Sequence, residues 1–83
     1  MPRDFEQVRQ QLALNVRALR ADRQLSQEQL ALDADVDRTY VSQIERAIGN
    51  PSLLVLCKLG FVLGVDINDL LGPKHFRGGE RSR

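Results

Sequence analysis

The sequence predicts an all-α domain built from five short helices. Apolar residues recur at spacings of three and four along most of the chain, and residues that cap helix N-termini precede the apolar segments. No stretch shows the sustained alternation of polar and apolar residues that a half-buried strand requires. The chain has 83 residues, of which 42% are hydrophobic, and a chain of this size supports one modest core. We therefore expect a single helical domain over residues 1–72.

The first helix is expected over residues 4–23, with Asp4 as its cap. Its apolar side chains follow the helical period and so define one face that packs on the core. The residues on this face are Phe5, Val8, Leu12, Val16 and Leu19.

Two shorter helices follow, separated by a short turn. Ser26 and Gln29 have the spacing of a capping box, which predicts a helix over residues 26–34. Asp37 is a favourable cap for the next helix, because its carboxylate suits the positive end of the helix dipole. That helix is expected to end near Arg46.

These two helices are predicted to pack closely across the turn. The small side chain of Ala31 allows the second helix to cross near the first, while Val36, Val41 and Ile44 are placed to fill the angle between them. Residues 27–46 are therefore interpreted as a helix-turn-helix unit.

The outer face of the second helix of this unit is polar at its N-terminal end. In a helix-turn-helix, that end of the second helix enters the major groove of DNA. Arginine pairs bidentately with guanine, glutamine does so with adenine, and threonine offers a hydroxyl and a methyl group to base edges. The residues expected to contact bases are Arg38, Thr39, Ser42 and Gln43.

Two further helices complete the predicted domain. Ser52 caps a fourth helix that runs to about Leu63 and is ended by Gly64, and Asp66 starts a short fifth helix. A glycine-proline pair closes the fifth helix. Glycine, arginine and serine dominate after that point, so residues 73–83 are expected to form a disordered basic tail.

Three segments of the chain carry a family resemblance. They are Leu25-Ser26-Gln27-Glu28-Gln29-Leu30-Ala31, Arg38-Thr39-Tyr40-Val41-Ser42-Gln43-Ile44-Glu45-Arg46 and Asn50-Pro51-Ser52-Leu53. Together they resemble the lambda-repressor-like, XRE/Cro-type helix-turn-helix family, and the resemblance covers residues 12–71. The start of the third helix looks most like that of the controller proteins of restriction-modification systems. The resemblance implies a five-helix fold in which the second and third helices read DNA.

The resemblance also implies roles for individual residues. The residues expected to contact phosphates are Gln27, Tyr40, Arg46 and Asn50. For Tyr40, packing at the edge of the core is the alternative. Arg20 and Glu45 match positions that form an ion pair between the first and third helices in several relatives. This pairing is physically reasonable, because a charge at the edge of the core needs a partner if it is buried.

The sequence departs from the family pattern at two loops. Asp35 stands in the turn where the family usually has glycine, and aspartate tolerates a left-handed backbone better than most residues. The loop Ala47-Ile48-Gly49 replaces a segment that is usually glycine-rich and basic. We expect this loop to hold phosphate less strongly.

The fourth helix departs as well, because it is apolar on nearly all sides. Such a helix is normally buried on nearly all sides, and an interface formed by the fourth and fifth helices of two subunits would supply that burial. Cys57 is expected to be a small buried side chain. The residues expected at the dimer interface are Leu54, Val55, Phe61, Val62 and Ile67. As an alternative, Phe61 packs within its own chain on Phe5 and Val8.

Composition excludes several other classes of protein. The net charge is only +1, so the DNA interpretation depends on where the arginines lie. One cysteine and one histidine allow neither an internal disulfide nor a zinc cluster. Asp33, Asp35 and Asp37 span a helix end and a turn, which does not suit a metal site. The N-terminus lacks the pattern of a signal peptide. We expect a cytoplasmic protein without metal, cofactor or membrane segment.

We therefore expect a homodimeric transcription regulator whose partner is a near-palindromic, double-stranded DNA operator. RNA polymerase is kept as a candidate second partner. The alternative is an antitoxin or other protein-binding module with the same fold, in which the apolar surface of the fourth helix meets a different chain. An enzyme is not expected, because the sequence offers no cluster of nucleophile, base and metal ligands.

Overall fold

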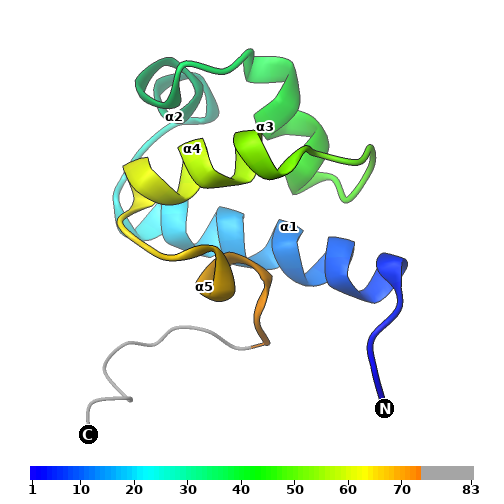
Figure 1. Cartoon of the computed structure of the whole chain (residues 1–83). Coiled ribbons are helices and arrows are strands. Elements are labelled where there is room, and N and C mark those ends of the chain that lie inside the picture. The colour runs from blue at the N-terminus through cyan, green and yellow to red at the C-terminus, as the bar shows by residue number, and fades with distance from the viewer. Residues whose placement is uncertain (74–83) are drawn as a thin grey trace, which may run out of the picture.

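The computed structural model describes residues 1–73, which form five α-helices. The helices are α1 (Phe5–Asp22), α2 (Gln27–Ala34), α3 (Arg38–Glu45), α4 (Leu53–Leu63) and α5 (Ile67–Leu71) (Figure 1). No strand is present within residues 1–73. The all-α prediction is therefore confirmed, and the helix bounds differ from those expected by about one residue. Nearly all of the expected basic tail, residues 74–83, lies outside the described residues.

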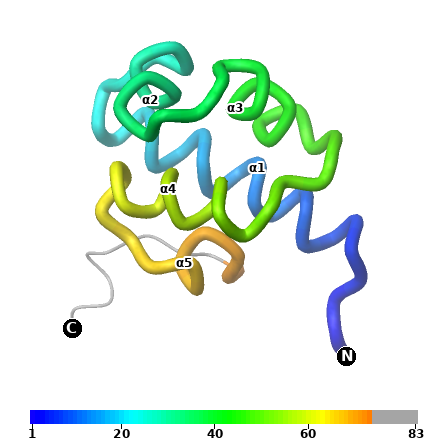
Figure 2. Tube along the Cα trace, turned by 45° about the horizontal axis from the view of Figure 1, so that its top comes forward, coloured from blue at the N-terminus to red at the C-terminus, as the bar shows by residue number. Residues whose placement is uncertain are grey.

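Helix α1 is the longest element, and the other four helices are arranged around it (Figures 1 and 2). It packs against α3 and α5, while α2 packs against α3 and α4, and α4 also contacts α5. All five helices contribute to one core. The buried apolar side chains that form this core are Leu12, Val16, Leu30, Ala31, Ala34, Val41, Ile44, Leu56, Leu59, Leu63 and Leu70.

The predicted apolar face of α1 is buried only along its middle. Leu12 and Val16 are in the core, but Phe5 is 55% exposed and Val8 is half-buried. The first two turns of α1 extend past the core, so periodicity alone overestimates how far along the helix burial reaches.

Every helix begins with a side-chain cap. The capping residues are Asp4, Ser26, Asp37, Ser52 and Asp66, and each accepts a hydrogen bond from a backbone N–H of the first turn. The capping box expected at α2 is only half formed. Ser26 Oγ accepts from the N–H of Gln29 at 2.9 Å, but the Gln29 side chain donates to Asp33 instead. Gln29 can form this alternative hydrogen bond because Asp33 lies one turn further along the same face of the helix.

Four helices end in the same hydrogen-bonded motif. One residue adopts the left-handed conformation, and the N–H of the next residue donates to a carbonyl five positions back, which is the Schellman arrangement. The left-handed residues are Gln24, Asp35, Ala47 and Gly64. The residues that follow them are Leu25, Val36, Ile48 and Val65, which are all apolar. The left-handed turn considered at Asp35 is therefore present, whereas those at Gln24 and Ala47 were not foreseen.

The short helix α5 is fastened to α1 by a buried asparagine. Asn15 is 3% exposed, and its Nδ2 donates to the carbonyls of Leu70 and Gly72 at 2.8 Å. Its Oδ1 accepts from Gln11 at 3.0 Å. The C-terminal carbonyls of a helix lack partners within the helix, so Asn15 satisfies groups that the short α5 leaves open.

Candidate nucleic-acid interface

The site begins with the packing of α2 on α3. The two helices are joined by the three residues 35–37. Ala31 is buried where the helices cross, Val36 packs on the core edge, and Val41 and Ile44 are buried on the inner face of α3. The predicted filling of the angle between the two helices by Val36, Val41 and Ile44 is therefore present. The opposite face of α3 is turned to solvent.

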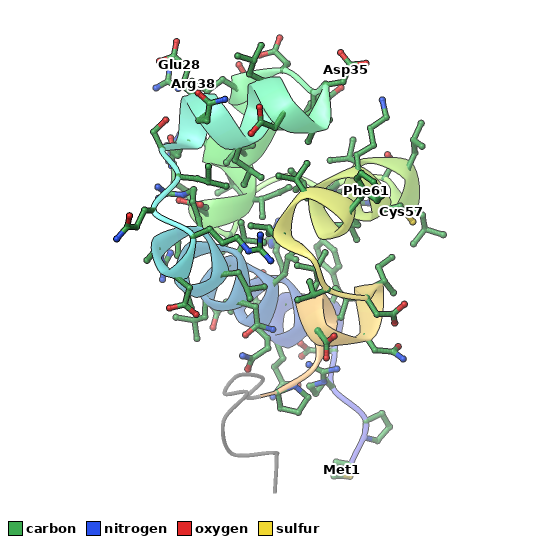
Figure 3. The ribbon with its side chains drawn as sticks, turned by 90° about the vertical axis from the view of Figure 1, so that its left-hand side faces the viewer. Met1, Glu28, Asp35, Arg38, Cys57 and Phe61 are labelled. Carbon is green, nitrogen blue, oxygen red and sulfur yellow. The ribbon has the colours of Figure 1, made fainter. Side chains whose placement is uncertain are left out.

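The four residues expected to contact bases all lie on α3. Arg38 and Thr39 are exposed in its first turn, while Ser42 and Gln43 are half-buried one turn later. Arg38 lies at the outer edge of the α2–α3 pair (Figure 3). Together these side chains give the exposed face of α3 a set of donors and acceptors at its N-terminal end.

The start of α3 is held by its cap. The N–H of Thr39 donates to Asp37 Oδ1 at 2.9 Å. This backbone hydrogen bond, with a smaller contribution from the Thr39 hydroxyl, lowers the pKa of the Asp37 carboxyl from its ordinary value, because both stabilise the charged form. The carboxylate therefore fixes the end of the helix that carries Arg38.

The four residues expected to contact phosphates are not equivalent in the structure. Tyr40, Arg46 and Asn50 are exposed, but Gln27 is half-buried at the start of α2. The Nε2 of Gln27 donates to Glu45 Oε1 at 2.9 Å. An amide nitrogen has two N–H groups, so Gln27 uses one of them inside the protein.

Glu45 joins the three helices of the site. The expected ion pair with Arg20 is present: Arg20 Nε lies 2.7 Å from Glu45 Oε2, and Arg20 Nη2 donates to Oε1 at 2.9 Å. These hydrogen bonds raise the pKa of Arg20. Glu45 is only 4% exposed, and the bidentate geometry with the bond from Gln27 compensates for its burial.

Besides the bond from Gln27, two contacts of α1 arginines in this network were not predicted from the sequence. Arg17 of α1 donates to the backbone carbonyl of Glu45, and Arg20 Nη1 donates to the carbonyl of Leu25 at 2.9 Å. Arg17 thus contacts the C-terminal end of α3, and Arg20 contacts the loop between α1 and α2. The guanidinium charges thus interact favourably with the negative end of α3 and with the loop before α2.

A second feature of the surface is an exposed apolar stripe along α4, formed by Leu53, Leu54, Cys57 and Phe61 and called here the α4 stripe. Phe61 is 87% exposed and Leu54 is 64% exposed. Cys57 and Phe61 are one turn apart and both point away from the core (Figure 3). The other expected interface residues, Val55, Val62 and Ile67, are half-buried.

Two expectations about α4 are wrong for the single chain. Cys57 is exposed rather than buried, and Phe61 does not pack on Phe5 and Val8. The inner face of α4 consists of Leu56, Leu59, Gly60 and Leu63, which are buried where α4 packs against α2 and α5. Cys57 and Phe61 are one helical turn apart, so they lie on the same side of α4. This side is opposite the buried face and is exposed to solvent.

The described residues hold no other site of recognisable chemistry. No group of His, Cys, Asp and Glu side chains within residues 1–73 is placed to hold a metal ion. Within the same part of the chain, no helix has both the length and the apolar character needed to cross a membrane.

The fold and the site define a helix-turn-helix DNA-binding domain. Comparison with known families agrees, since the helix-turn-helix family model HTH_3 matches residues 16–70. The chain belongs to this family.

Individual relatives point the same way. A hypothetical transcription factor from Neisseria is 40% identical, with a TM-score of 0.78, over 89% of this chain and 88% of its own. The control protein C.SmaI of Serratia marcescens is 39% identical over 81% of this chain and 80% of its own. SinR of Bacillus subtilis, solved in complex with DNA, is 34% identical with a TM-score of 0.69, over 74% of this chain and 98% of its own. The chain is therefore a DNA-binding transcription regulator.

Proposed function

We propose that the protein is a homodimeric regulator that binds a near-palindromic operator, with α3 of each protomer in the major groove. The observation that carries this proposal is the exposed polar N-terminal half of α3. Arg38 is suited to guanine, Gln43 to adenine, and the hydroxyls of Thr39 and Ser42 to either kind of base edge. These side chains lie on a helix braced from behind by the core, so they approach the DNA in a fixed arrangement.

The phosphate contacts are proposed to surround α3. Tyr40 and Arg46 are exposed on α3 and just after it, and Asn50 lies in the loop that follows. Gln27 contributes its second amide N–H from the start of α2, where the backbone N–H groups also favour an anion. These contacts fix the register of the protein on DNA and carry no sequence information directly.

The dimer is proposed to form through the α4 stripe, with Val55, Val62 and Ile67 at its border. A contiguous apolar surface on a small protein commonly marks an interaction site. A symmetric pair would place two α3 helices on half-sites about 34–36 Å apart, which is one turn of DNA. The half-sites would then lie on one face of the duplex and be related by the symmetry of the protein.

The likeness to C.SmaI supports a narrower role as a controller of a restriction-modification system. Such a regulator would respond to its own concentration and carry out no catalytic step. A contact with RNA polymerase is not part of the proposal, since no feature of residues 1–73 points to it.

Selection of binding sites from a random duplex pool, at near-physiological salt, tests the proposal. We expect a near-palindromic consensus from the wild-type protein. Arg38→Ala should lose the preference at one position of each half-site while the thermal unfolding midpoint stays unchanged, because the side chain is exposed. Arg3→Ala is the matched control, since Arg3 donates to the Leu71 carbonyl at the far end of the molecule.

Two results would contradict the proposal. The first is a folded wild-type protein that enriches no sequence, which would favour the antitoxin-like alternative and a search for a protein target. The second is an Arg38→Ala variant that retains the full consensus, which would remove α3 from the reading of bases.

A further inference from the structure

The first two turns of α1 lie against the loop between α3 and α4 (Figure 1), and Arg9 is the polar link between them. Its Nη1 donates to the carbonyl of Gly49 at 3.0 Å. The same guanidinium lies 4.8 Å from the centroid of the Phe5 ring and pairs with the carboxylate of Glu6. A cation over an aromatic face is attracted to it, so Phe5 and Glu6 hold Arg9 in the position from which it reaches the loop.

The loop that receives this hydrogen bond has few soft torsions. Ala47 is fixed by the hydrogen bonds that end α3, and Pro51 has a locked φ and disfavours helical conformations of Asn50. Gly49, with φ +82°, is the residue of the loop whose backbone torsions change most easily. Because a peptide unit is planar, holding the Gly49 carbonyl also fixes the amide of Asn50. The contact from Arg9 therefore orients the residue proposed to bind phosphate.

Packing alone supports the loop weakly at this place. An open pocket of about 160 Å³ lies between the first turns of α1 and the loop, lined by Phe5, Val8, Leu12, Asn50 and Pro51 among others. Side chains that face this open pocket make fewer packing contacts with the protein on that side. The hydrogen bond from Arg9 is thus the specific contact that holds the loop to α1.

We infer that Arg9 is a positioning residue for DNA binding, which presents Asn50 to the DNA backbone without contacting DNA itself. This inference rests on the proposed function, and specifically on the phosphate contact of Asn50. A group that is ordered before binding does not have to be ordered at the moment of binding, so affinity gains without a new contact. Arg9 is supplied by the N-terminal part of α1, which precedes the residues matched by the family model.

The variant Arg9→Met tests this role, because methionine keeps an unbranched apolar stem and removes the donors. We expect affinity for the selected operator to fall about fivefold, the scale of one hydrogen bond, with the thermal unfolding midpoint close to that of the wild type. Arg3→Met is the matched control. It removes an arginine that donates at 2.8 Å to the Leu71 carbonyl of α5 and makes no hydrogen bond to the loop, and it should leave affinity unchanged.

A double-mutant cycle with Asn50→Ala decides how Arg9 acts. If Arg9 acts through Asn50, Arg9→Met costs no further affinity in the Asn50→Ala background. The slope of log affinity against log salt should also stay constant, because a positioning residue releases no counterions.

Several outcomes would overturn the inference. Equal fold-losses in both backgrounds would show that Arg9 acts independently of Asn50. A salt slope reduced by about two for the dimer, or about one for each protomer, would show a direct phosphate contact. A wild-type protein that selects an operator which Arg9→Met binds equally tightly would overturn this inference alone. A wild-type protein that selects no operator would overturn the proposed function together with it.

Discussion

The carboxylate of Glu45 receives hydrogen bonds from two other helices, Arg20 of α1 and Gln27 of α2. Its two oxygens are buried, and each is occupied by at least one donor. The position of the end of α3 thus depends on one side chain that is not expected to touch DNA. Its neighbour Arg46 is exposed to solvent and is expected to contact DNA rather than to hold the helices together.

Substitution of these neighbours separates stability from DNA binding. Glu45→Ala removes the acceptor for Arg20 and Gln27 and should lower the free energy of unfolding by about 3 kcal/mol. Arg46→Ala should change it by less than about 0.5 kcal/mol yet weaken DNA binding. Urea unfolding without DNA measures the first effect, and a binding titration measures the second. Equal stability of the two variants would contradict the role given to Glu45.

The sequence allowed the Arg20–Glu45 pair to be predicted, but not its neighbours. The pair joins two charged residues within residues 12–71, the range that the family resemblance covers. Gln27 and Arg17 contact a residue far along the chain, and no local pattern identifies such a partner. Asn15 did leave a signal, because it is a polar residue beside Leu12 and Val16 on the apolar face of α1. A polar side chain in that position indicates a buried hydrogen bond.

At the scale of the helices, starts were more predictable than ends. The N-caps depend on side-chain oxygens of Ser and Asp, which the sequence displays directly. The ends depend on a left-handed backbone, and only Gly64 among the four such residues is a glycine. Gln24 and Ala47 adopt this conformation despite their side chains. The more useful signal is the apolar residue that follows each of the four, because it packs back on the helix it ends.

Ala47→Gly should therefore stabilise the protein. A Cβ in the left-handed region costs about 1 kcal/mol or somewhat more, and part of the gain is offset by the greater freedom of glycine in the unfolded chain. We expect a net increase of about 0.5 kcal/mol or more in the free energy of unfolding. Chemical denaturation measures it.

Ala18→Gly is the matched control for this prediction. Ala18 is exposed inside α1, where the same exchange should destabilise the protein by about 1 kcal/mol. The two substitutions are identical in chemistry and opposite in expected sign. If both destabilise, the left-handed backbone at Ala47 is not a source of strain.

At the scale of the whole molecule, α4 was interpreted correctly in one respect and wrongly in another. Its composition predicted more apolar surface than one chain can bury, and the α4 stripe is that surface. Cys57 was nevertheless expected inside, because single-residue tendencies describe which types are buried and not which side of a given helix faces the core. Which side chains of α4 are half-buried, such as Val55 and Val62, and which are exposed depends on how α4 packs against α2 and α5, which is a tertiary property.

Phe61→Glu should convert the protein to monomers, since it places a charge in the middle of the proposed interface. Sedimentation at low micromolar concentration measures the change in mass, and operator affinity should fall with it. Leu32→Glu is the control, because Leu32 is an exposed apolar residue on α2 and is not part of the α4 stripe. A Phe61→Glu variant that remains dimeric would place the interface elsewhere. A wild-type protein that is monomeric alone would direct attention to a different partner chain.

If the α4 stripe forms the proposed dimer interface, its narrowness has a consequence for timing. An interface whose exposed apolar centre is four side chains of one helix leaves room for free monomers at low abundance, and mass action then governs the supply of dimers. Below the dissociation constant of the dimer, operator occupancy would rise with the square of the protein concentration. After a cell begins to synthesise this chain, the operator would stay largely unoccupied until enough dimer has formed. The dissociation constant of the dimer would set the length of that delay.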